Sequence, residues 1–192
     1  FQTSGANRSN NIAVGASRLN NLIVMPGQTV SVSDTILPRT RANGYKEAGV
    51  YVNGAHTTGL GGGVCQISST VYNAVKNAGL TVVQRNPHSM PVSYLPKGLD
   101  AAIAAGSKDL KFRNDYTTPV VLYTDTSNKH LTVNVLVWNQ ELAGRSFKLW
   151  AKQTGALSAD TYFTTYLNGK EISTQFVGTS RYNPYREAVN DD

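Results

Sequence analysis

The sequence predicts an α+β fold, a mostly antiparallel sheet with helices on one side, followed by a β-rich C-terminal extension. Three observations predict this class. Apolar residues recur at helical spacing in two segments, alternate with polar residues in several short segments, and flank two Asn-Gly pairs typical of β-hairpin turns. With 192 residues, of which 40% are hydrophobic and 16% charged, the chain can bury one sizeable core.

The first half of the chain begins with a predicted amphipathic helix at residues 10–22. Its apolar positions Ile12, Ala16 and Leu19 recur near the helical period, and an Asn cluster stands at its start. The other elements expected before residue 60 are a turn at 25–28, a strand at 29–33, turns near Pro38 and Gly44, a short helix at 45–48, a strand at 49–52 and a hairpin turn at Asn53-Gly54.

The segment 65–78 predicts a helix most strongly. Ile67, Val71 and Val75 fall on one helical face, and Gly79 stands where a C-cap glycine belongs. The run Gly61-Gly62-Gly63 precedes this helix. Cys65 is therefore expected at or beside the helix N-terminus, next to backbone amides that no side chain shields.

Strands dominate the remainder of the chain. They are predicted at 80–85, 92–95, 101–105, 110–114, 120–124 and 131–138, with a loop at 86–91. The pattern changes near Gln140, which divides the chain into a domain at 1–140 and a β-rich extension at 141–192. Within the extension, strands are expected in 147–152, 160–167 and 171–176, with Asn168-Gly169 as the hairpin turn between the last two.

Composition excludes several classes of protein. The net charge of +6 favours an anionic partner, but the chain has no basic run or RNA-binding motif, so we expect no nucleic acid partner. No apolar stretch approaches the roughly 18 residues of a membrane span. A single cysteine forms no internal disulfide, and neither a CxxC pair nor an HExxH motif is present, so we expect no metal site of these kinds. No cofactor is expected either, because thiolate chemistry needs none.

Cys65 and His88 are the residues to which the sequence points for chemistry. A helix N-terminus favours the nucleophilic thiolate, although most cysteines are small buried hydrophobic residues. His88 follows one helix and one strand later, enough chain to return beside the thiol, take its proton and pass it to a leaving amine. Asp100, Asp109 and Asn86 are the candidates for the residue that orients the imidazole, and for Asp100 a turn or cap role fits about equally well.

Two further features can bind substrate. Arg39, Arg85 and Arg113 are each able to hold a carboxylate, although any one of them is more typical of a solvated surface. The amides expected to bind an oxyanion lie around Cys65, at Gly62, Gly63 and Val64.

Several blocks of residues occur here in the order of a known family. They include Gly61-Gly62-Gly63-Val64-Cys65-Gln66-Ile67-Ser68-Ser69-Thr70, His88-Ser89-Met90-Pro91-Val92-Ser93-Tyr94 and Gly98-Leu99-Asp100-Ala101. On these blocks the chain resembles the VanW domain of bacterial surface proteins, from Phe1 to about Trp138. Val30 and Val32 replace the usual Phe residues and Leu37 a usual Gly, changes that leave the cysteine and histidine in place.

The resemblance implies L,D-transpeptidation of peptidoglycan. In that reaction Cys65 attacks the third residue of a tetrapeptide stem and expels the terminal D-Ala, and a side-chain amine of a neighbouring stem resolves the acyl-enzyme into a 3-3 cross-link. His88 is then the general base and acid, and Asp100 orients it. The residues expected to bind substrate are Arg39, Gly62, Gly63, Val64, Ser89 and Tyr94.

Two other interpretations stay open. A non-catalytic module would bind peptidoglycan or a D-Ala-terminated peptide, with a structural cysteine and glycines that serve tight packing. A carboxypeptidase or endopeptidase would use the same residues with water as the acceptor. The resemblance also implies an extracellular location at the cell wall or surface of a Gram-positive bacterium, as part of a longer anchored or secreted protein.

Overall fold

The computed structural model describes residues 1–52 and 55–185, and the predicted α+β class is confirmed in this part of the chain. Its helices are α1 (Ala6–Ser17), α2 (Val32–Ile36), α3 (Val64–Asn77) and α4 (Asn139–Leu142), with a 3-10 turn at Ser127–Lys129. Its strands are β1 (Leu22–Val24), β2 (Thr29–Ser31), β3 (Glu47–Val52), β4 (Ala55–Leu60), β5 (Thr81–Gln84), β6 (Lys111–Arg113), β7 (Val120–Asp125), β8 (Thr132–Leu136), β9 (Arg145–Gly155), β10 (Ser158–Leu167) and β11 (Lys170–Arg181).

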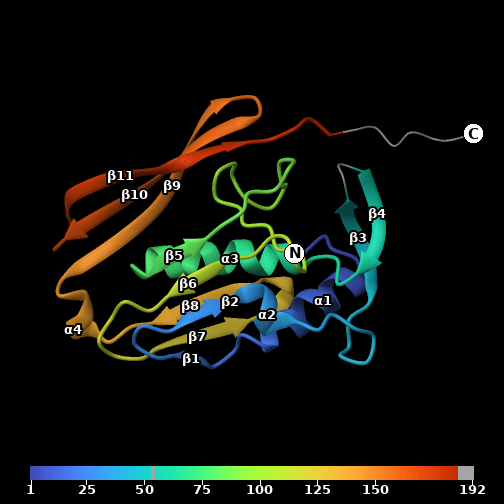
Figure 1. Ribbon diagram of the computed structural model, residues 1–192, viewed down its shortest axis with the longest axis horizontal. Helices are drawn as coiled ribbons and strands as arrows, with labels where there is room; N and C mark the ends of the chain where they lie inside the picture. Colours follow the sequence, from blue (N-terminus) through green and yellow to red (C-terminus); the bar gives the residue numbers. More distant parts are fainter. Residues whose placement is uncertain (53–54, 186–192) are drawn as a thin grey trace, which may run out of the picture.

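The strands of the described residues pair antiparallel in four small sheets. The three-stranded sheets have the orders β1-β7-β8, β2-β6-β5 and β11-β10-β9, and β3 pairs with β4. Helix α3 lies between them and contacts α1, β5, β8 and β9. Figure 1 shows the long strands β9, β10 and β11 above α3, the sheet of β1, β7 and β8 below it, and β3 and β4 beyond its N-terminal end.

Helix α3 forms because its apolar positions face this surrounding core. Ile67, Val71 and Val75 are fully buried, as is Ile12 of α1, so the predicted helix is confirmed to within one residue at each end. Gly79 follows its C-terminus with φ +81°, and a Cβ there would lie 2.4 Å from the Phe147 ring. Only glycine suits both the left-handed backbone and the close contact with β9.

The first helix differs from the prediction in its bounds. Helix α1 begins at Ala6 and ends at Ser17, whereas residues 10–22 were expected. Leu19 is fully buried just past the helix and Leu22 starts β1, so inward-facing residues continue at a helix-like spacing beyond the helix end. The hydrophobic spacing therefore predicted correctly which residues are buried but not where the helix begins and ends.

Two other predictions in this region need correction. The strand expected at 29–33 ends at Ser31, because the Ser31 hydroxyl accepts the Asp34 N–H and caps α2. The helix expected at 45–48 is wrong: Tyr45 is buried, its hydroxyl donates to the Ile36 carbonyl at 2.9 Å, and β3 begins at Glu47. Strand β4 was not predicted, and the expected Asn53-Gly54 turn lies outside the described residues.

The strands expected at 92–95 and 101–105 are also wrong. Neither segment belongs to a sheet, apart from an isolated bridge between Ala104 and Lys108. Ala101 and Ile103 are nevertheless buried, because side chains of α3 and the loop after β5 hold this stretch in place of neighbouring strands. An apolar run alone did not distinguish a paired strand from a buried loop.

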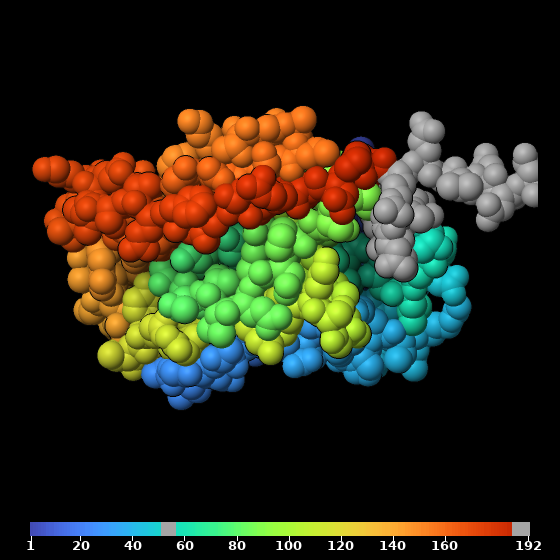
Figure 2. Space-filling model, turned by 45° about the horizontal axis from the view of Figure 1, so that its top comes forward, coloured from blue at the N-terminus to red at the C-terminus, as the bar shows by residue number. Residues whose placement is uncertain are grey.

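The C-terminal extension is a three-stranded meander with longer strands than predicted. The turn Asn168-Gly169 has φ values of +50° and +80°, which confirms the hairpin expected from this dipeptide. In Figure 2 the extension, coloured orange to red, lies directly against the green region that includes β5 and the loop after it. Leu149 of β9 is buried with the main core, so the extension shares that core.

Candidate active site

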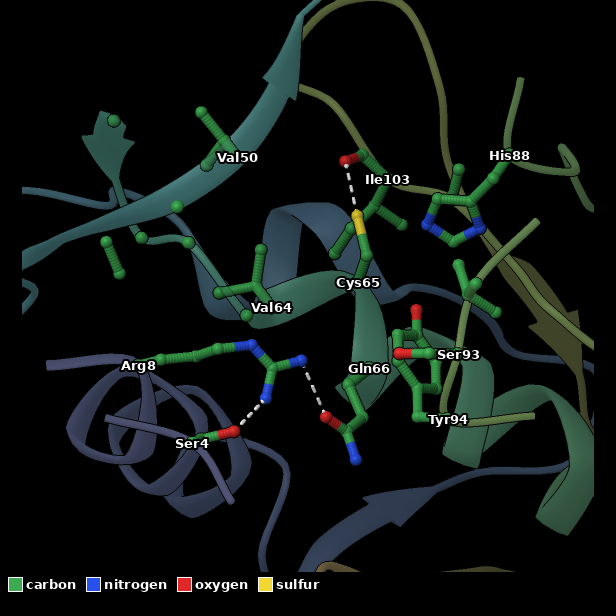
Figure 3. Close-up of a pocket in the computed structure, with 18 of the residues that line it drawn as sticks. Ser4, Arg8, Val50, Val64, Cys65, Gln66, His88, Ser93, Tyr94 and Ile103 are labelled. Carbon is green, nitrogen blue, oxygen red and sulfur yellow. Dashed lines mark hydrogen bonds between the residues drawn. The ribbon is translucent and has the colours of Figure 1, made fainter. Parts of the chain in front are cut away.

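Cys65 is the second residue of α3 and stands at the N-terminal end of the helix. Its thiol donates a weak hydrogen bond to the Ile103 carbonyl, with Sγ and the oxygen 3.4 Å apart, as Figure 3 shows. The Val64 N–H bonds Gly61 O and the Gln66 N–H bonds Gly63 O, whereas no acceptor among the described residues takes the Cys65 N–H. A free amide is thus next to the sulfur.

The glycine run brings this helix end close to neighbouring backbone. A Cβ on Gly62 would lie 2.6 Å from the Gly49 carbonyl oxygen of β3, and Gly63 has φ +110°. The Gly62 carbonyl in turn accepts from the side chain of Asn11 on α1, at 3.0 Å. The glycines therefore have a packing role, whatever their amides bind.

The serines that follow Cys65 hold the buried segment 101–103 against helix α3. Ser68 Oγ donates to the Ala101 carbonyl at 2.5 Å, and Ser69 Oγ accepts the Ala101 N–H at 3.0 Å. These bonds fix residues 101–103 along α3 and place the Ile103 carbonyl beside the thiol. Ser68 and Ser69 therefore have a structural role: their hydroxyls make the hydrogen bonds to the Ala101 backbone that a neighbouring strand would make in a sheet.

His88 lies in the loop after β5, with its ring bound to Asp100. The Nδ1 atom is 2.6 Å from Asp100 Oδ2, and the His88 backbone N–H donates to the same oxygen at 2.7 Å. Because the carboxylate can only accept, Nδ1 carries the proton and Nε2 is the ring nitrogen left for the thiol. The structure thus brings Cys65, His88 and Asp100 together.

Asp100 is buried behind the histidine and is held by two further side chains, one of which is itself bound by a backbone N–H. Arg85 Nη2 lies 3.2 Å and the Tyr182 hydroxyl 2.5 Å from Oδ1, and the Gly98 N–H donates to the Tyr182 oxygen at 2.7 Å. Burial raises the pKa of Asp100, but hydrogen bonds from His88 and Tyr182 and the Arg85 charge outweigh it and lower the pKa to about 2. Asp100 is therefore an anion at all ordinary pH values.

The thiol and the imidazole stabilise each other's charged forms. Burial raises the pKa of Cys65, but the neighbouring His88 and, to a smaller extent, the charge of Arg39 lower it overall. Burial also opposes the charge on His88, yet its bonds to Asp100 and Cys65 raise its pKa to about 9. The site therefore favours a thiolate–imidazolium pair, the reactive form of a cysteine nucleophile.

These residues open onto a cleft of about 1900 Å³. The predicted site residues that line it are Arg39, Gly62, Gly63, Val64, Cys65, His88, Ser89 and Tyr94. Figure 3 shows Cys65 and His88 on one part of its wall and Arg8, Gln66 and Tyr94 on another. Burial raises the pKa of Tyr94, whose hydroxyl lies 3.4 Å from Ser69 Oγ. Ser89 is exposed.

Three other residues that the sequence suggested for the site have other binding partners. Arg85 is occupied by Asp100, and Arg113 forms an ion pair with Asp115 2.5 Å away at the surface. Asp109 accepts from Ser31 Oγ at 2.6 Å rather than from the histidine. These contacts leave Arg39 as the arginine in the cleft among the three proposed for a carboxylate.

Two contributors to the site were missed by sequence reasoning. Tyr182 follows β11 and reaches Asp100 from the extension, and Arg8 of α1 lines the cleft while donating to Ser4 and, at 2.7 Å, to Gln66. No pattern in the sequence marks either residue, since a tyrosine or an arginine at such a position has no chemical motif of its own. The described residues contain no cluster of metal-binding side chains, and none of their helices has the length and apolar character to span a bilayer.

Together the fold and the site define a class: an α+β protein with a cysteine at a helix N-terminus and a histidine–aspartate pair beside it. The family model described as VanW like protein matches residues 7–136, and the chain belongs to this family.

Two curated relatives agree with this assignment. Uncharacterized protein YoaR of Bacillus subtilis (strain 168) is 43% identical over 122 residues, which cover 64% of this chain and 40% of that protein. Vancomycin B-type resistance protein VanW of Enterococcus faecalis (strain ATCC 700802 / V583) is 36% identical over 114 residues, covering 57% and 42%. The chain thus spans about two fifths of these relatives, and no solved structure matches it.

Proposed function

We propose that the chain is a cysteine L,D-transpeptidase that forms 3-3 cross-links between peptidoglycan stem peptides. One observation carries the chemistry: in an open cleft, the Cys65 thiol at the start of α3 adjoins His88, whose Nδ1 is 2.6 Å from the buried Asp100 carboxylate. Membership of the VanW family supports the proposed substrate, through the transpeptidation that the resemblance to that family implies.

Acylation begins when the Cys65 thiolate attacks the carbonyl carbon of the third residue of a tetrapeptide stem. A sulfur–carbon bond forms, and negative charge develops on the carbonyl oxygen, for which the free Cys65 N–H at the helix N-terminus is the best-placed donor. The carbon–nitrogen bond to D-Ala then breaks, and the proton held by His88 passes to the leaving amine. Asp100 keeps the imidazolium oriented and stabilised throughout.

Transfer reverses these steps with a different amine. The side-chain amine of a neighbouring stem attacks the thioester, its proton passes to His88, a new amide bond forms and the sulfur–carbon bond breaks. Cys65 returns to the thiolate and His88 to the imidazolium, so the cycle needs no cofactor. If water attacks instead, the same site acts as a carboxypeptidase or endopeptidase.

A non-catalytic module that binds peptidoglycan is the second candidate. The packing roles of Gly62 and Gly63 favour it, because they account for the glycine run without any catalytic amide. The directions of the Cys65 and His88 pKa shifts oppose it, because a thiol and an imidazole that favour each other's charged forms have no evident use in simple binding. Either activity places the chain outside the cell, at the wall of a bacterium.

Product analysis distinguishes these activities. Purified disaccharide-tetrapeptide is incubated with the wild type and with Cys65→Ala, and the muropeptides are identified by mass spectrometry. A transpeptidase yields a dimer lacking one D-Ala, a carboxypeptidase a trimmed monomer, and a binding module neither. The Cys65→Ala variant must lose the product while it remains folded and binds the peptide, otherwise the proposed mechanism is wrong.

A further inference from the structure

Arg39 is a cation in the cleft whose charge has no partner in the part of the chain that the structure describes. Its Nη1 atom is buried, yet no described residue accepts a hydrogen bond from it. The other arginine that lines the cleft, Arg8, is engaged by Ser4 and Gln66. A buried guanidinium nitrogen without an acceptor is costly, and a bound anion would remove that cost.

The position of Arg39 relates this unused donor to the nucleophile. Its aliphatic stem packs on Gly61, where an added Cβ would lie 3.0 Å from Arg39 Cδ, and the left-handed φ of +81° at Gly61 also requires glycine. Gly61 leads directly into the start of α3, so the Arg39 stem lies beside the loop that carries Cys65, and both residues line the same cleft. The Arg39 charge is close enough to favour the thiolate there.

We propose that Arg39 binds the free C-terminal carboxylate of the residue that leaves when Cys65 is acylated. This inference rests on the proposed function and adds its substrate selection: the cleft accepts peptides that end one residue after the bond to be broken. In such a peptide the carboxylate follows the attacked carbonyl by a single residue, about 3.5 Å of chain. A guanidinium and a carboxylate form a charge-assisted bond that an amide in the same place does not.

The direct test varies the peptide end and the arginine together. A tetrapeptide donor with a free carboxylate is compared with the same donor carrying a C-terminal amide, using the wild type, Arg39→Gln and Arg39→Lys. Acylation of Cys65 is followed by intact-protein mass spectrometry. The matched control is Arg41→Gln, since Arg41 lies two residues away, is largely exposed and pairs with Glu47.

The wild type is expected to prefer the carboxylate donor by roughly ten- to a hundredfold. Arg39→Gln should lose most of this preference, mainly by slower reaction of the carboxylate donor, with little change for the amide donor. Arg39→Lys should restore part of it, because the charge returns without the bidentate geometry. Arg41→Gln should behave as the wild type. A preference unchanged in a folded Arg39→Gln variant overturns the proposal.

A binding measurement separates this inference from the proposed function. If no donor acylates the wild type, calorimetry with Cys65→Ala and with the Cys65→Ala/Arg39→Gln double variant still tests the arginine. Tighter binding of the carboxylate peptide that disappears with Arg39→Gln supports a carboxylate site in a module without transpeptidase activity. Equal binding of both peptides, or binding of neither, overturns the carboxylate site.

Discussion

At the scale of single residues, Asp100 connects the parts of the candidate site. Its two oxygens receive hydrogen bonds from the backbone and ring of His88, from Arg85 and from Tyr182. It therefore fixes the ring orientation and supplies the negative charge that keeps the imidazole protonated. Every group that contacts the carboxylate is a donor, so protonation or neutral replacement of Asp100 leaves several donors unsatisfied.

The first prediction concerns the thiol's reactivity with pH. Because the pKa of Cys65 is lowered, alkylation by iodoacetamide should have its half-maximal rate at a lower pH in the native protein than in the urea-unfolded chain. Asp100→Asn should move that midpoint upward, since a less stable imidazolium stabilises the thiolate less. An unchanged midpoint in Asp100→Asn would show that Asp100 does not act through His88.

The second prediction is that the rate of acyl transfer falls at alkaline pH. The imidazolium form of His88 persists up to about pH 9 and is lost above it, which removes the proton needed by the leaving amine. Initial rates of cross-linked dimer formation, measured from pH 5 to about 10, should therefore decline through about pH 9. A rate that keeps rising there would mean that His88 is not the general acid.

Sequence reasoning proposed Cys65 because it stands near a predicted helix start, and His88 because one helix and one strand separate it from Cys65; the catalytic role of both stays a prediction. It could only name Asp100 beside Asp109 and Asn86, because all three are polar residues in comparable loops. The deciding fact is a contact across the fold, between His88 Nδ1 and Asp100 Oδ2 at 2.6 Å. Asp109 accepts from Ser31 instead. Such a choice depends on tertiary packing and not on local pattern.

At the scale of elements, the N-terminus of α3 is defined by close packing as much as by its own sequence. The glycines allow it to touch β3, and Ser68 and Ser69 bind residues 101–103 along its side. The periodic helix was predictable because its apolar face repeats every turn. The strand expected at 101–105 was wrong, because side chains of α3 make hydrogen bonds to this backbone that the prediction had assigned to a neighbouring strand.

Gly62→Ala tests this packing. The added Cβ would lie 2.6 Å from a backbone oxygen of β3, which cannot rotate away, so we expect a loss of about 2 kcal/mol or more in the free energy of unfolding. Gly5→Ala is the control, since nothing lies within 4 Å of its Cβ position. Urea unfolding of both variants gives the comparison; equal stability would contradict the contact with β3.

At the scale of the whole molecule, the C-terminal extension takes part in the site. The matched family region ends at residue 136, yet Tyr182 bonds Asp100, and Ser180 accepts from Arg85 Nη1 at 2.9 Å. The division expected near Gln140 thus separates residues that function together in our proposal. Sequence could predict the strands of the extension but not this contact, which joins positions far apart in the chain.

Tyr182→Phe tests that contribution. Loss of a hydrogen bond to a charged acceptor should slow acylation several-fold and destabilise the fold by about 1.5–3 kcal/mol. It should also shift the alkylation midpoint of Cys65 upward, a change that a purely structural role would not cause. Tyr123→Phe, at an exposed position of β7, is the control and should alter neither quantity. An unshifted midpoint in Tyr182→Phe would restrict the tyrosine to a structural role.

The most direct test of the central claim is to capture the acyl-enzyme. The wild type is mixed with a tetrapeptide donor without any acceptor amine, quenched in acid, and analysed by intact and peptide-level mass spectrometry. We predict a mass increase equal to the donor minus its terminal residue, located on Cys65, removed by neutral hydroxylamine as a thioester and absent in His88→Ala. A folded protein that binds the donor but never carries this adduct would contradict covalent catalysis by Cys65.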